Sequence, residues 1–358
     1  MFHEKKQILN LNRKRIGEKR NYNSQNIYID RNERSLDFNN LFYRKFKKKI
    51  KHINRYPSLD GIYKKLSSFF KVNKKNIFIT DGVAGGIRQL IEIFTKEKVS
   101  NIIYFEPSFA LYEVYADLFL LKKNKILYDL SEDITFNLIK NRINKNTAII
   151  FLPIPDNPIS KYITKKDLNL LAKYCDRNKI ILAIDEVYSD YSKYSFIKET
   201  LNYKYTVVLR SFSKSFGAAG IRFGMAISSE FVMNYLHNYR SAYEANSLSI
   251  LFAETLLENI SEKNNYVKQV NKSRKIIHNT LKSLNIKYYS SNHGNYVYVD
   301  MEDEIKKNNI LMFLKKEKIF VRGSWKGRFK NGFSITITDI QTTNKFIKSL
   351  LKFYDNKR

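Results

Sequence analysis

The chain has 358 residues, of which 43% are hydrophobic and 27% are charged. This apolar content excludes a disordered or collagen-like polymer, because such chains lack the buried surface that offsets the entropy lost on ordering. With 64 basic and 34 acidic side chains the net charge is +30, which raises the question of a nucleic-acid or anionic-membrane partner. Lysine is spread along the whole chain, however, and this favours a solvated surface over a nucleic-acid site.

The elements predicted first in the chain form a β-α-β unit. Residues 1–40 are polar and are predicted to be an arm that packs on another surface. The runs 76–80 and 101–105 are rich in β-branched and aromatic residues, and the segment between them has apolar residues at helical spacing. Four further short apolar runs follow, separated by segments long enough for helices. They lie at 148–152, 180–184, 207–209 and 223–227.

This alternation predicts an α/β fold with a mostly parallel sheet covered by helices, in a large domain at 41–260. After a helix-rich stretch at about 230–284, short strand-like runs alternate with helical segments again. They lie at 295–299, 319–321 and 333–337. The C-terminal part, 261–358, is therefore predicted to be a small α+β domain, with the arm at 1–40 packed against it.

The chain shows no export, membrane or metal signal. Its single cysteine, Cys175, cannot form an internal disulfide, which predicts a reducing compartment and a cytoplasmic location. Residues 1–26 carry charges throughout, and no 18 apolar residues run uninterrupted, so no membrane partner is predicted. The five histidines lack ligand spacing, and one cysteine cannot complete a zinc site, so no metal is predicted.

Polar side chains follow the ends of three predicted strands. Because ligands of a parallel α/β sheet bind at the carboxyl ends of its strands, these residues are candidates for one functional site. Each has an ordinary alternative when it is taken singly: a surface lysine, a helix cap, a turn residue or a surface ion pair. They are Asn157, Asp185, Tyr188, Ser211, Ser213, Lys214 and Arg222.

Taken jointly, their spacing resembles the pyridoxal-phosphate (PLP) enzymes of the aspartate aminotransferase fold, most closely the histidinol-phosphate aminotransferase branch. The resemblance covers about residues 26–350 and implies the fold-type I architecture of class I/II aminotransferases, with seven strands in the large sheet. The intervals are 28 residues from Asn157 to Asp185, 3 from Asp185 to Tyr188, 3 from Ser211 to Lys214 and 8 from Lys214 to Arg222.

The resemblance implies roles for the residues around the cofactor ring. Lys214 would bind PLP through an imine and then move a proton between substrate and cofactor. Asp185 would keep the pyridine nitrogen protonated, since a carboxylate about 3 Å away contributes about 5 kcal/mol of gross attraction at an effective dielectric of about 20. Tyr188 and Asn157 would donate hydrogen bonds to the phenolate oxygen of the cofactor.

It also implies a phosphate cradle. Ser211, Ser213 and Arg222 would supply side-chain donors, each charge-assisted bond contributing about 1.5–3 kcal/mol. Backbone N–H groups would come from a turn at a helix start, where the helix dipole favours an anion. Relatives usually carry a hydroxyl or an acid in this turn, whereas this chain offers only backbone. The turn residues are Val83, Ala84 and Gly85.

Two aromatic residues match further family positions. Phe109 matches the residue that stacks on the cofactor ring, although a single aromatic side chain is more often part of a core. Tyr56 matches the tyrosine that reaches the cofactor phosphate of the neighbouring subunit, which implies a homodimer with shared active sites. The ordinary alternative for Tyr56 is a surface tyrosine before a proline.

The substrate is predicted from a departure from the family. Relatives hold an α-carboxylate with an arginine at the position of Ser334, whereas Arg322, in the region that binds a distal anion in phosphate-using relatives, is present. The segment with Asn32 and Arg34 resembles a loop that closes over small phospho- or phosphono-aldehydes in relatives that decorate surface polysaccharides. We therefore predict an aminotransferase of a small phosphorylated or phosphonate-bearing amine or carbonyl.

Two other functions stay open. A glutamate donor carries an α-carboxylate that Ser334 would hold poorly, although Arg322, Arg328 or Arg34 could substitute. The runner-up is therefore a PLP-dependent decarboxylase of an O-phospho amino acid, which releases its carboxylate. From another class, a non-enzymatic basic nucleic-acid-binding protein on the same scaffold would account for the net charge, but an intact Lys214 argues against it.

Overall fold

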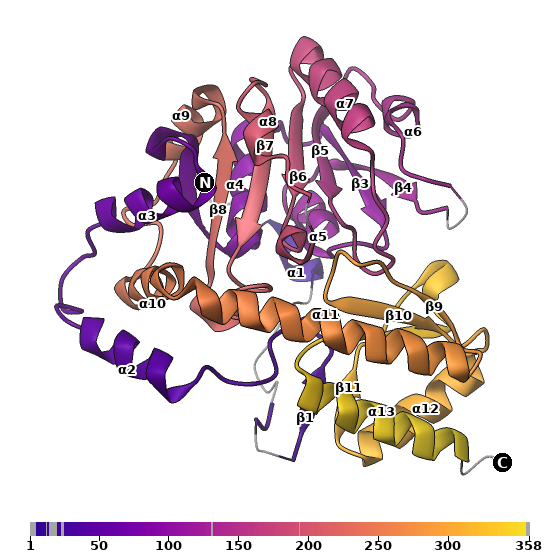
Figure 1. Ribbon diagram of the computed structural model, residues 1–358. Coiled ribbons are helices and arrows are strands. Elements are labelled where there is room, and N and C mark those ends of the chain that lie inside the picture. Colours follow the sequence, from indigo (N-terminus) through magenta and orange to yellow (C-terminus); the bar gives the residue numbers. More distant parts are fainter. Residues whose placement is uncertain are drawn as a thin grey trace.

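A seven-stranded sheet forms the centre of the computed structural model, which describes residues 5–11, 13, 20–22, 25–129, 132–192 and 194–355. Its strands are β2 (Ile77–Asp81), β3 (Asn101–Glu106), β4 (Lys122–Leu127), β5 (Thr147–Pro153), β6 (Ile181–Asp185), β7 (Thr206–Ser211) and β8 (Phe223–Ser228). They lie in the order β2-β8-β7-β6-β5-β3-β4, and only β8 is antiparallel to its neighbours (Figure 1). The predicted mostly parallel seven-stranded sheet is confirmed.

Strand β4 is the one large-sheet strand absent from the six apolar runs. It lies at the edge of the sheet and carries Lys122, Lys123 and Lys125. Two of these lysines form ion pairs, Lys123 with Asp117 at 2.7 Å and Lys125 with Glu113 at 2.8 Å. Charged side chains on an edge strand prevent pairing with other sheets, and they also conceal the strand from a search for apolar runs.

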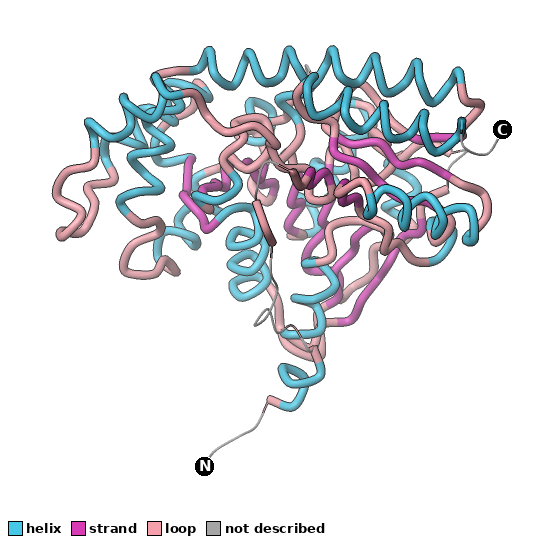
Figure 2. The backbone as a smooth tube through the Cα atoms, turned by 90° about the horizontal axis from the view of Figure 1, so that it is seen from below, coloured by secondary structure: helices cyan, strands magenta, loops and turns pink. Residues whose placement is uncertain are grey.

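Helices cover both faces of the large sheet (Figure 2). Alternate strand residues belong to different cores, as Phe78 and its neighbour Ile79 illustrate, because successive side chains of a strand point to opposite faces. One face packs against α4 (Gly82–Phe94), α5 (Leu111–Leu118) and α9 (Glu230–Asn238). The other packs against α2 (Asn40–Lys49), α3 (Asp60–Phe70), α7 (Lys165–Asn178) and α10 (Ser247–Glu258).

The C-terminal part has its own antiparallel sheet and its own core. Its strands are β9 (Lys287–Tyr289), β10 (Tyr296–Asp300) and β12 (Gly332–Thr336), and its helices are α11 (Ile260–Ser283), α12 (Glu304–Lys316) and α13 (Ile340–Asp355). Helix α11 runs below the large sheet and reaches this C-terminal sheet (Figure 1). The predicted α+β character is confirmed, whereas the boundaries 1–40, 41–260 and 261–358 stay predictions.

The N-terminal segment joins the C-terminal part through β1 (Ile27–Ile29), which pairs in parallel with β11 (Ile319–Val321). Within the described ranges, no helix combines the length and the hydropathy needed to span a lipid bilayer. The remaining helices are α1 (Lys6–Asn10), α6 (Phe136–Lys140) and α8 (Ile197–Thr200), with short 3-10 turns at η1 (Lys74–Asn76), η2 (Ser189–Tyr191), η3 (Ala219–Ile221) and η4 (Gly327–Phe329).

Candidate active site

The carboxyl ends of three neighbouring strands assemble the candidate site. Asp185 ends β6 and Ser211 ends β7, and these two strands pair in parallel. Lys214 lies in the turn that follows β7, and Asn157 lies half-buried in the turn that follows β5. The structure thus brings to one edge of the sheet residues that are far apart in the sequence.

Asp185 is a buried carboxylate with two hydrogen-bond donors. The Tyr112 hydroxyl donates to Oδ2 at 2.9 Å, and the Val187 backbone N–H donates to Oδ1 at 3.1 Å. Burial raises the pKa of Asp185 to about 6, although both hydrogen bonds favour the ionised form. Asp185 therefore presents an oriented carboxylate that suits a cationic partner.

Tyr112 is a site residue that the sequence analysis missed. It is fully buried in α5 and stacks on Phe151 of β5 with ring centroids 4.9 Å apart. Its position on an apolar helix face marks it as core. The only signal in the sequence is its position three residues after Phe109, in the first turn of the helix that follows.

Lys214 carries an amine that is easier to deprotonate than an ordinary lysine. Its pKa is lowered to about 8, chiefly by burial and also by the nearby Arg222 and Arg322 guanidinium groups, while the carboxylates of Glu33 and Asp185 oppose the shift. The Nζ atom donates to the backbone carbonyl of Arg31 at 2.7 Å. At neutral pH a larger fraction of this amine is unprotonated, which is the form that attacks a carbonyl.

Tyr188 is held between the two parts of the molecule. The Asn32 side-chain amide donates to the Tyr188 hydroxyl at 2.8 Å, and Tyr188 packs edge-on against Tyr296 with centroids 4.8 Å apart. Burial raises the pKa of Tyr188, so its hydroxyl keeps its proton. The backbone N–H of Asn32 in turn donates to Thr336 Oγ1 at 2.9 Å, which fixes Asn32 on the C-terminal sheet.

The start of α4 and Arg222 form a narrow cradle. A Cβ atom on Gly82 would lie 2.6 Å from Arg222 Nη2, and one on Gly224 would lie 2.6 Å from the Gly82 carbonyl carbon. Gly82 has a φ of 60°, so glycine suits both its conformation and its surroundings. Val83 and Ala84 follow in the first helical turn, where backbone N–H groups point out of the helix.

The hydroxyl groups next to this turn complete a donor set. The Ser211 hydroxyl donates to Ser213 Oγ at 2.9 Å, and both serines are buried. Arg222 has its Nε 3.5 Å from Asp81 Oδ1, on an exposed carboxylate. A guanidinium, two hydroxyls and free helix N–H groups are the donors that bind a phosphate group, so the residues present fit the phosphate of PLP.

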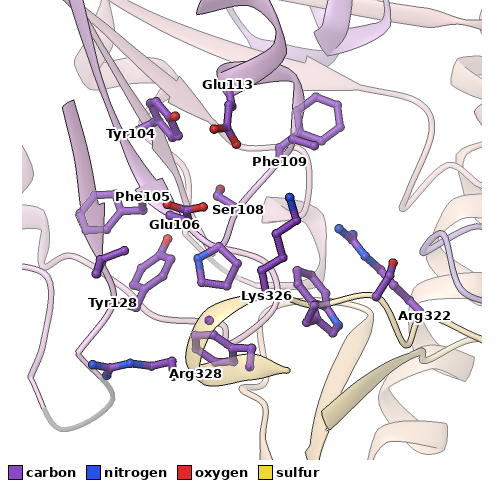
Figure 3. A pocket seen from close by; sticks show the side chains of 17 residues that line it. Tyr104, Phe105, Glu106, Ser108, Phe109, Glu113, Tyr128, Arg322, Lys326 and Arg328 are labelled. Atoms are coloured by element: carbon purple, nitrogen blue, oxygen red, sulfur yellow. The ribbon is translucent and has the colours of Figure 1, made fainter. Parts of the chain in front are cut away.

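A cavity of about 340 Å³ opens between the turn after β3 and the loop after β11 (Figure 3). Phe109, 43% exposed, lines it and packs edge-on against Tyr112 at 5.9 Å. From the opposite side, Arg322, Lys326 and Arg328 reach the cavity (Figure 3). Three cationic side chains on this wall suit an anionic ligand, and the two carboxylates of the other wall, Glu106 and Glu113, are paired with Lys125.

Ser334 and Arg322 are direct neighbours. Their backbones exchange two hydrogen bonds, of 3.0 and 2.8 Å, and Ser334 is buried. The Arg322 guanidinium lies 3.9 Å from the ring centroid of Trp325. Burial lowers the pKa of Arg322, and among the described residues no carboxylate forms an ion pair with it. A half-buried cation without a carboxylate partner among the described residues therefore lies beside Ser334.

Arg34 lies against Gly217 of the Lys214 turn, where a Cβ atom on Gly217 would be 2.5 Å from Arg34 Cδ, and its role at the substrate stays a prediction. Its guanidinium lies 3.7 Å from the Glu262 carboxylate and between the rings of Phe38 and Tyr266, and its Nε donates to the Leu36 carbonyl at 2.9 Å. These contacts occupy the side chain with helix α11 and its own loop. Arg34 therefore anchors the N-terminal segment in this structure and does not line the cavity.

Tyr56 lies on the surface of the subunit. It is 80% exposed and stacks face to face on Tyr243, with ring centroids 4.4 Å apart and an interplanar angle of 5°. Tyr243 is itself 40% exposed, so both rings of this stacked pair are accessible from outside the subunit. The pair presents two aromatic side chains to the outside of the subunit.

A protein family and several relatives match this chain. The model of the family described as aminotransferase class I and II matches residues 32–350. A histidinol-phosphate aminotransferase of Buchnera aphidicola is 28% identical over 92% of both chains, and one of Pyrococcus furiosus is 29% identical over 93% of this chain and 94% of its own. The structure of a histidinol-phosphate aminotransferase of Sinorhizobium meliloti in complex with pyridoxal-5'-phosphate superposes with a TM-score of 0.84 at 16% identity, over 93% of this chain and 92% of that one.

Proposed function

The chain belongs to the class I and II aminotransferases, and from this membership we propose that it is a PLP-dependent transaminase that binds its cofactor through Lys214. The family expected from the motif spacing is confirmed. The observation that carries the proposal is the placement of an easily deprotonated amine, Lys214, beside a buried carboxylate, Asp185, and a phosphate-binding cradle at Arg222. Family membership also favours an enzyme over the nucleic-acid-binding alternative.

The residues of this chain would divide the work as follows. PLP supplies a carbonyl group that takes up an amine and a ring that stabilises negative charge at the substrate Cα. Lys214 Nζ can accept the proton that leaves this carbon, since its pKa of about 8 suits transfer near neutral pH. Asp185, oriented by Tyr112, would stabilise positive charge on the ring nitrogen, and Tyr188 and Asn157 would donate to the ring oxygen.

The two shifted pKa values predict how apoprotein takes up PLP as the pH changes. Because the free amine is the reacting form, the rate of capture at Lys214 should rise about tenfold per pH unit and level off near pH 8. Affinity should weaken as the pH falls through about 6, where Asp185 of the apoprotein gains a proton. Stopped-flow absorbance and equilibrium titration measure the two effects; a flat rate profile from pH 6 to 8 would contradict the assignment.

We propose a small amine or carbonyl that bears a phosphate or phosphonate as the substrate. The support is Arg322, a half-buried cation at the cavity without a carboxylate partner in the described ranges, together with Lys326 and Arg328 on the same wall. A dianionic group gains charge-assisted hydrogen bonds from such cations. A place in surface-polysaccharide synthesis stays a prediction that rests on the segment 31–34.

Ser334 favours a second candidate, the decarboxylase of an O-phospho amino acid. It has a short hydroxyl where relatives carry an arginine, and a hydroxyl holds an α-carboxylate less strongly than a guanidinium does. An enzyme that releases the carboxylate does not require a tight grip on it. Arg322, next to Ser334, could instead hold the glutamate carboxylate, and this keeps transamination as the first proposal.

One experiment separates the two candidates. Purified holoprotein is mixed with glutamate, and conversion of PLP to pyridoxamine phosphate is followed by absorbance, while carbon dioxide release is measured from phosphoserine and phosphothreonine. Conversion with glutamate, and its reversal by a phosphorylated carbonyl compound, is the result expected of a transaminase. Carbon dioxide release without conversion by glutamate would overturn it in favour of the decarboxylase.

We also propose a homodimer in which each Tyr56 completes the site of the other subunit. Its exposure and its stacking on Tyr243 support this proposal, because the ring is fixed yet available to a second copy. The prediction is complementation. Lys214→Ala and Tyr56→Ala subunits should each be impaired as pure dimers. A 1:1 mixture, after subunit exchange, should recover about a quarter of wild-type activity, since half the dimers then hold one intact site.

Size-exclusion chromatography with light scattering checks the dimer, and activity measured before and after subunit exchange checks the complementation. Full activity of the pure Tyr56→Ala dimer would contradict the proposed role of Tyr56. If mass spectrometry shows that heterodimers have formed but the mixture recovers no activity, the proposal that the subunits share active sites is contradicted.

A further inference from the structure

Four charged side chains lie directly behind the candidate site, of which Arg210 and Glu186 are buried and Asp190 and Lys263 are partly buried. The Arg210 guanidinium spans two carboxylates, with Nη1 3.1 Å from Glu186 Oε2 and Nη2 3.0 Å from Asp190 Oδ2. Lys263 Nζ lies 3.0 Å from the other oxygen of Asp190. The two positive and two negative charges balance, so the cluster is a neutral network inside the protein.

This network joins the two segments that carry the candidate site residues, 185–190 and 210–215. Glu186 directly follows Asp185, and Asp190 lies two residues after Tyr188. Arg210 precedes Ser211 at the end of β7. The remaining link is Ser215, directly after Lys214, whose hydroxyl donates to Asp190 Oδ2 at 2.6 Å.

Asp190 is a strong acceptor for this hydrogen bond. Burial opposes its ionisation, but the charges of Arg210 and Lys263 outweigh burial and hold its pKa at about 2. A hydrogen bond to a charged acceptor contributes about 1.5–3 kcal/mol, roughly twice the value for a neutral pair. Ser215 itself is fully buried, so solvent does not compete for its hydroxyl.

Aromatic packing holds the other side of the Lys214 turn. Phe212 and Phe216, on either side of Lys214, stack face to face at 4.0 Å, and the Lys263 ammonium lies 5.3 Å from the centroid of Phe216. Backbone hydrogen bonds close the turn, from the Gly217 N–H to the Lys214 carbonyl at 3.0 Å and from the Ala218 N–H to the Phe212 carbonyl at 2.9 Å. The apolar contacts themselves have no preferred direction. The hydrogen bond from Ser215 to Asp190 supplies a directional contact to the turn that carries Asp185 and Tyr188.

We propose that Ser215 and Asp190 are positioning residues that set the Lys214 amine relative to Asp185 and Tyr188. A buried ion network often stabilises a protein no better than apolar side chains of the same volume, so stability alone is a weak reason for such a cluster. The geometry supplies another reason, since the Arg210 guanidinium and the Ser215 hydroxyl join the segment 185–190 to the segment 210–215. The inference rests on the proposed role of Lys214.

The test compares two serine-to-alanine variants that each remove one hydrogen bond to the network. Ser215→Ala removes the link to the Lys214 turn. Ser195→Ala is the matched control, because the Ser195 hydroxyl donates to Glu186 Oε2 at 2.8 Å and lies in the segment after η2, away from Lys214. The readout uses apoprotein: the pH dependence of Lys214 labelling by trinitrobenzenesulfonate, mapped by peptide mass, together with the melting temperature.

Ser215→Ala should raise the midpoint of Lys214 labelling by about one pH unit, because a turn that has lost its side-chain hydrogen bond to Asp190 exposes the amine to water more often, which returns its pKa toward the ordinary value. Capture of PLP at pH 7 should slow about tenfold, in proportion to the free amine. Ser195→Ala should keep the wild-type midpoint of Lys214 labelling, even if its melting temperature falls as much as that of Ser215→Ala. Ser215→Thr, which keeps the hydroxyl, should restore the wild-type midpoint.

Equal midpoints in Ser215→Ala and wild type would overturn the inference, and so would equal shifts in both alanine variants, which indicate a merely structural role. If Ser215→Ala does not fold, Ser215→Cys keeps the volume with a weaker donor and is expected to show the same shift in smaller measure. Failure of wild-type apoprotein to capture PLP at Lys214 would instead refute the proposed function, so the two failures remain distinct.

Discussion

Replacing Lys214 by alanine is expected to lower kcat about 10⁴-fold, because in the proposed function this one side chain provides both the covalent attachment of PLP and the proton transfer at the substrate carbon. Burial is the main cause that lowers the pKa of its amine to about 8. Steady-state kinetics with a glutamate donor measures the loss. Borohydride reduction followed by peptide mass mapping should place the cofactor on Lys214 in the wild type and give no adduct in the variant.

A matched control is Lys173→Ala, which removes an exposed lysine of α7 far from the sheet edge that holds the site. It should keep wild-type activity and the wild-type adduct. Substantial activity in the Lys214→Ala protein would contradict the assignment. So would a borohydride-reduced cofactor adduct on another peptide of the wild type. Loss of folding is checked by the melting temperature, since truncation of a half-buried lysine need not unfold the chain.

Asp185→Asn is expected to lower kcat about 10³-fold while leaving the fold intact. The amide keeps the size of the carboxylate but removes its charge, and opposite charges 4 Å apart interact by about 4 kcal/mol at an effective dielectric of 20, which is about 10³ in rate. Affinity for PLP should fall with it. Asp185 is buried, so water cannot replace the lost charge.

Tyr112→Phe is a milder perturbation of the same carboxylate than Asp185→Asn. It deletes only the hydroxyl that donates to Asp185 at 2.9 Å and keeps the ring that stacks on Phe151. The expected loss is about tenfold, the value of one hydrogen bond to a charged group. Activity of Asp185→Asn within tenfold of wild type would show that its charge does not act on the cofactor, and that outcome contradicts the site assignment.

Much of the fold followed from local pattern. Strand β5 was visible as the run 148–152 because a strand buried on both faces must be apolar at every position. Strand β4 was not visible, since its lysines suit an edge position that only the assembled sheet defines. The short β1 was also missed, because its place beside β11 depends on residues nearly 300 positions away.

The candidate site divides in the same way. The sequence by itself indicated which residues are candidates for the chemistry, Lys214 and Asp185 among them, because the chain order of strands and the spacing after each strand end are local properties. Tertiary structure alone decided which partners these residues meet. The contacts of Asp185 with Tyr112 and of Asp190 with Ser215 depend on side-chain directions and distances that no periodicity records.

The contacts of Arg34 also depend on tertiary structure. Its role at the substrate stays a prediction, and the folded chain places its guanidinium beside Glu262 and Tyr266 of α11 and beside Phe38 of its own loop. A long side chain can reach several neighbours, and the one it meets is fixed by the packing of helix α11 against the N-terminal segment. Hydrogen bonds and ion pairs act over a few ångströms, so they are decided only when the backbone has brought distant segments together.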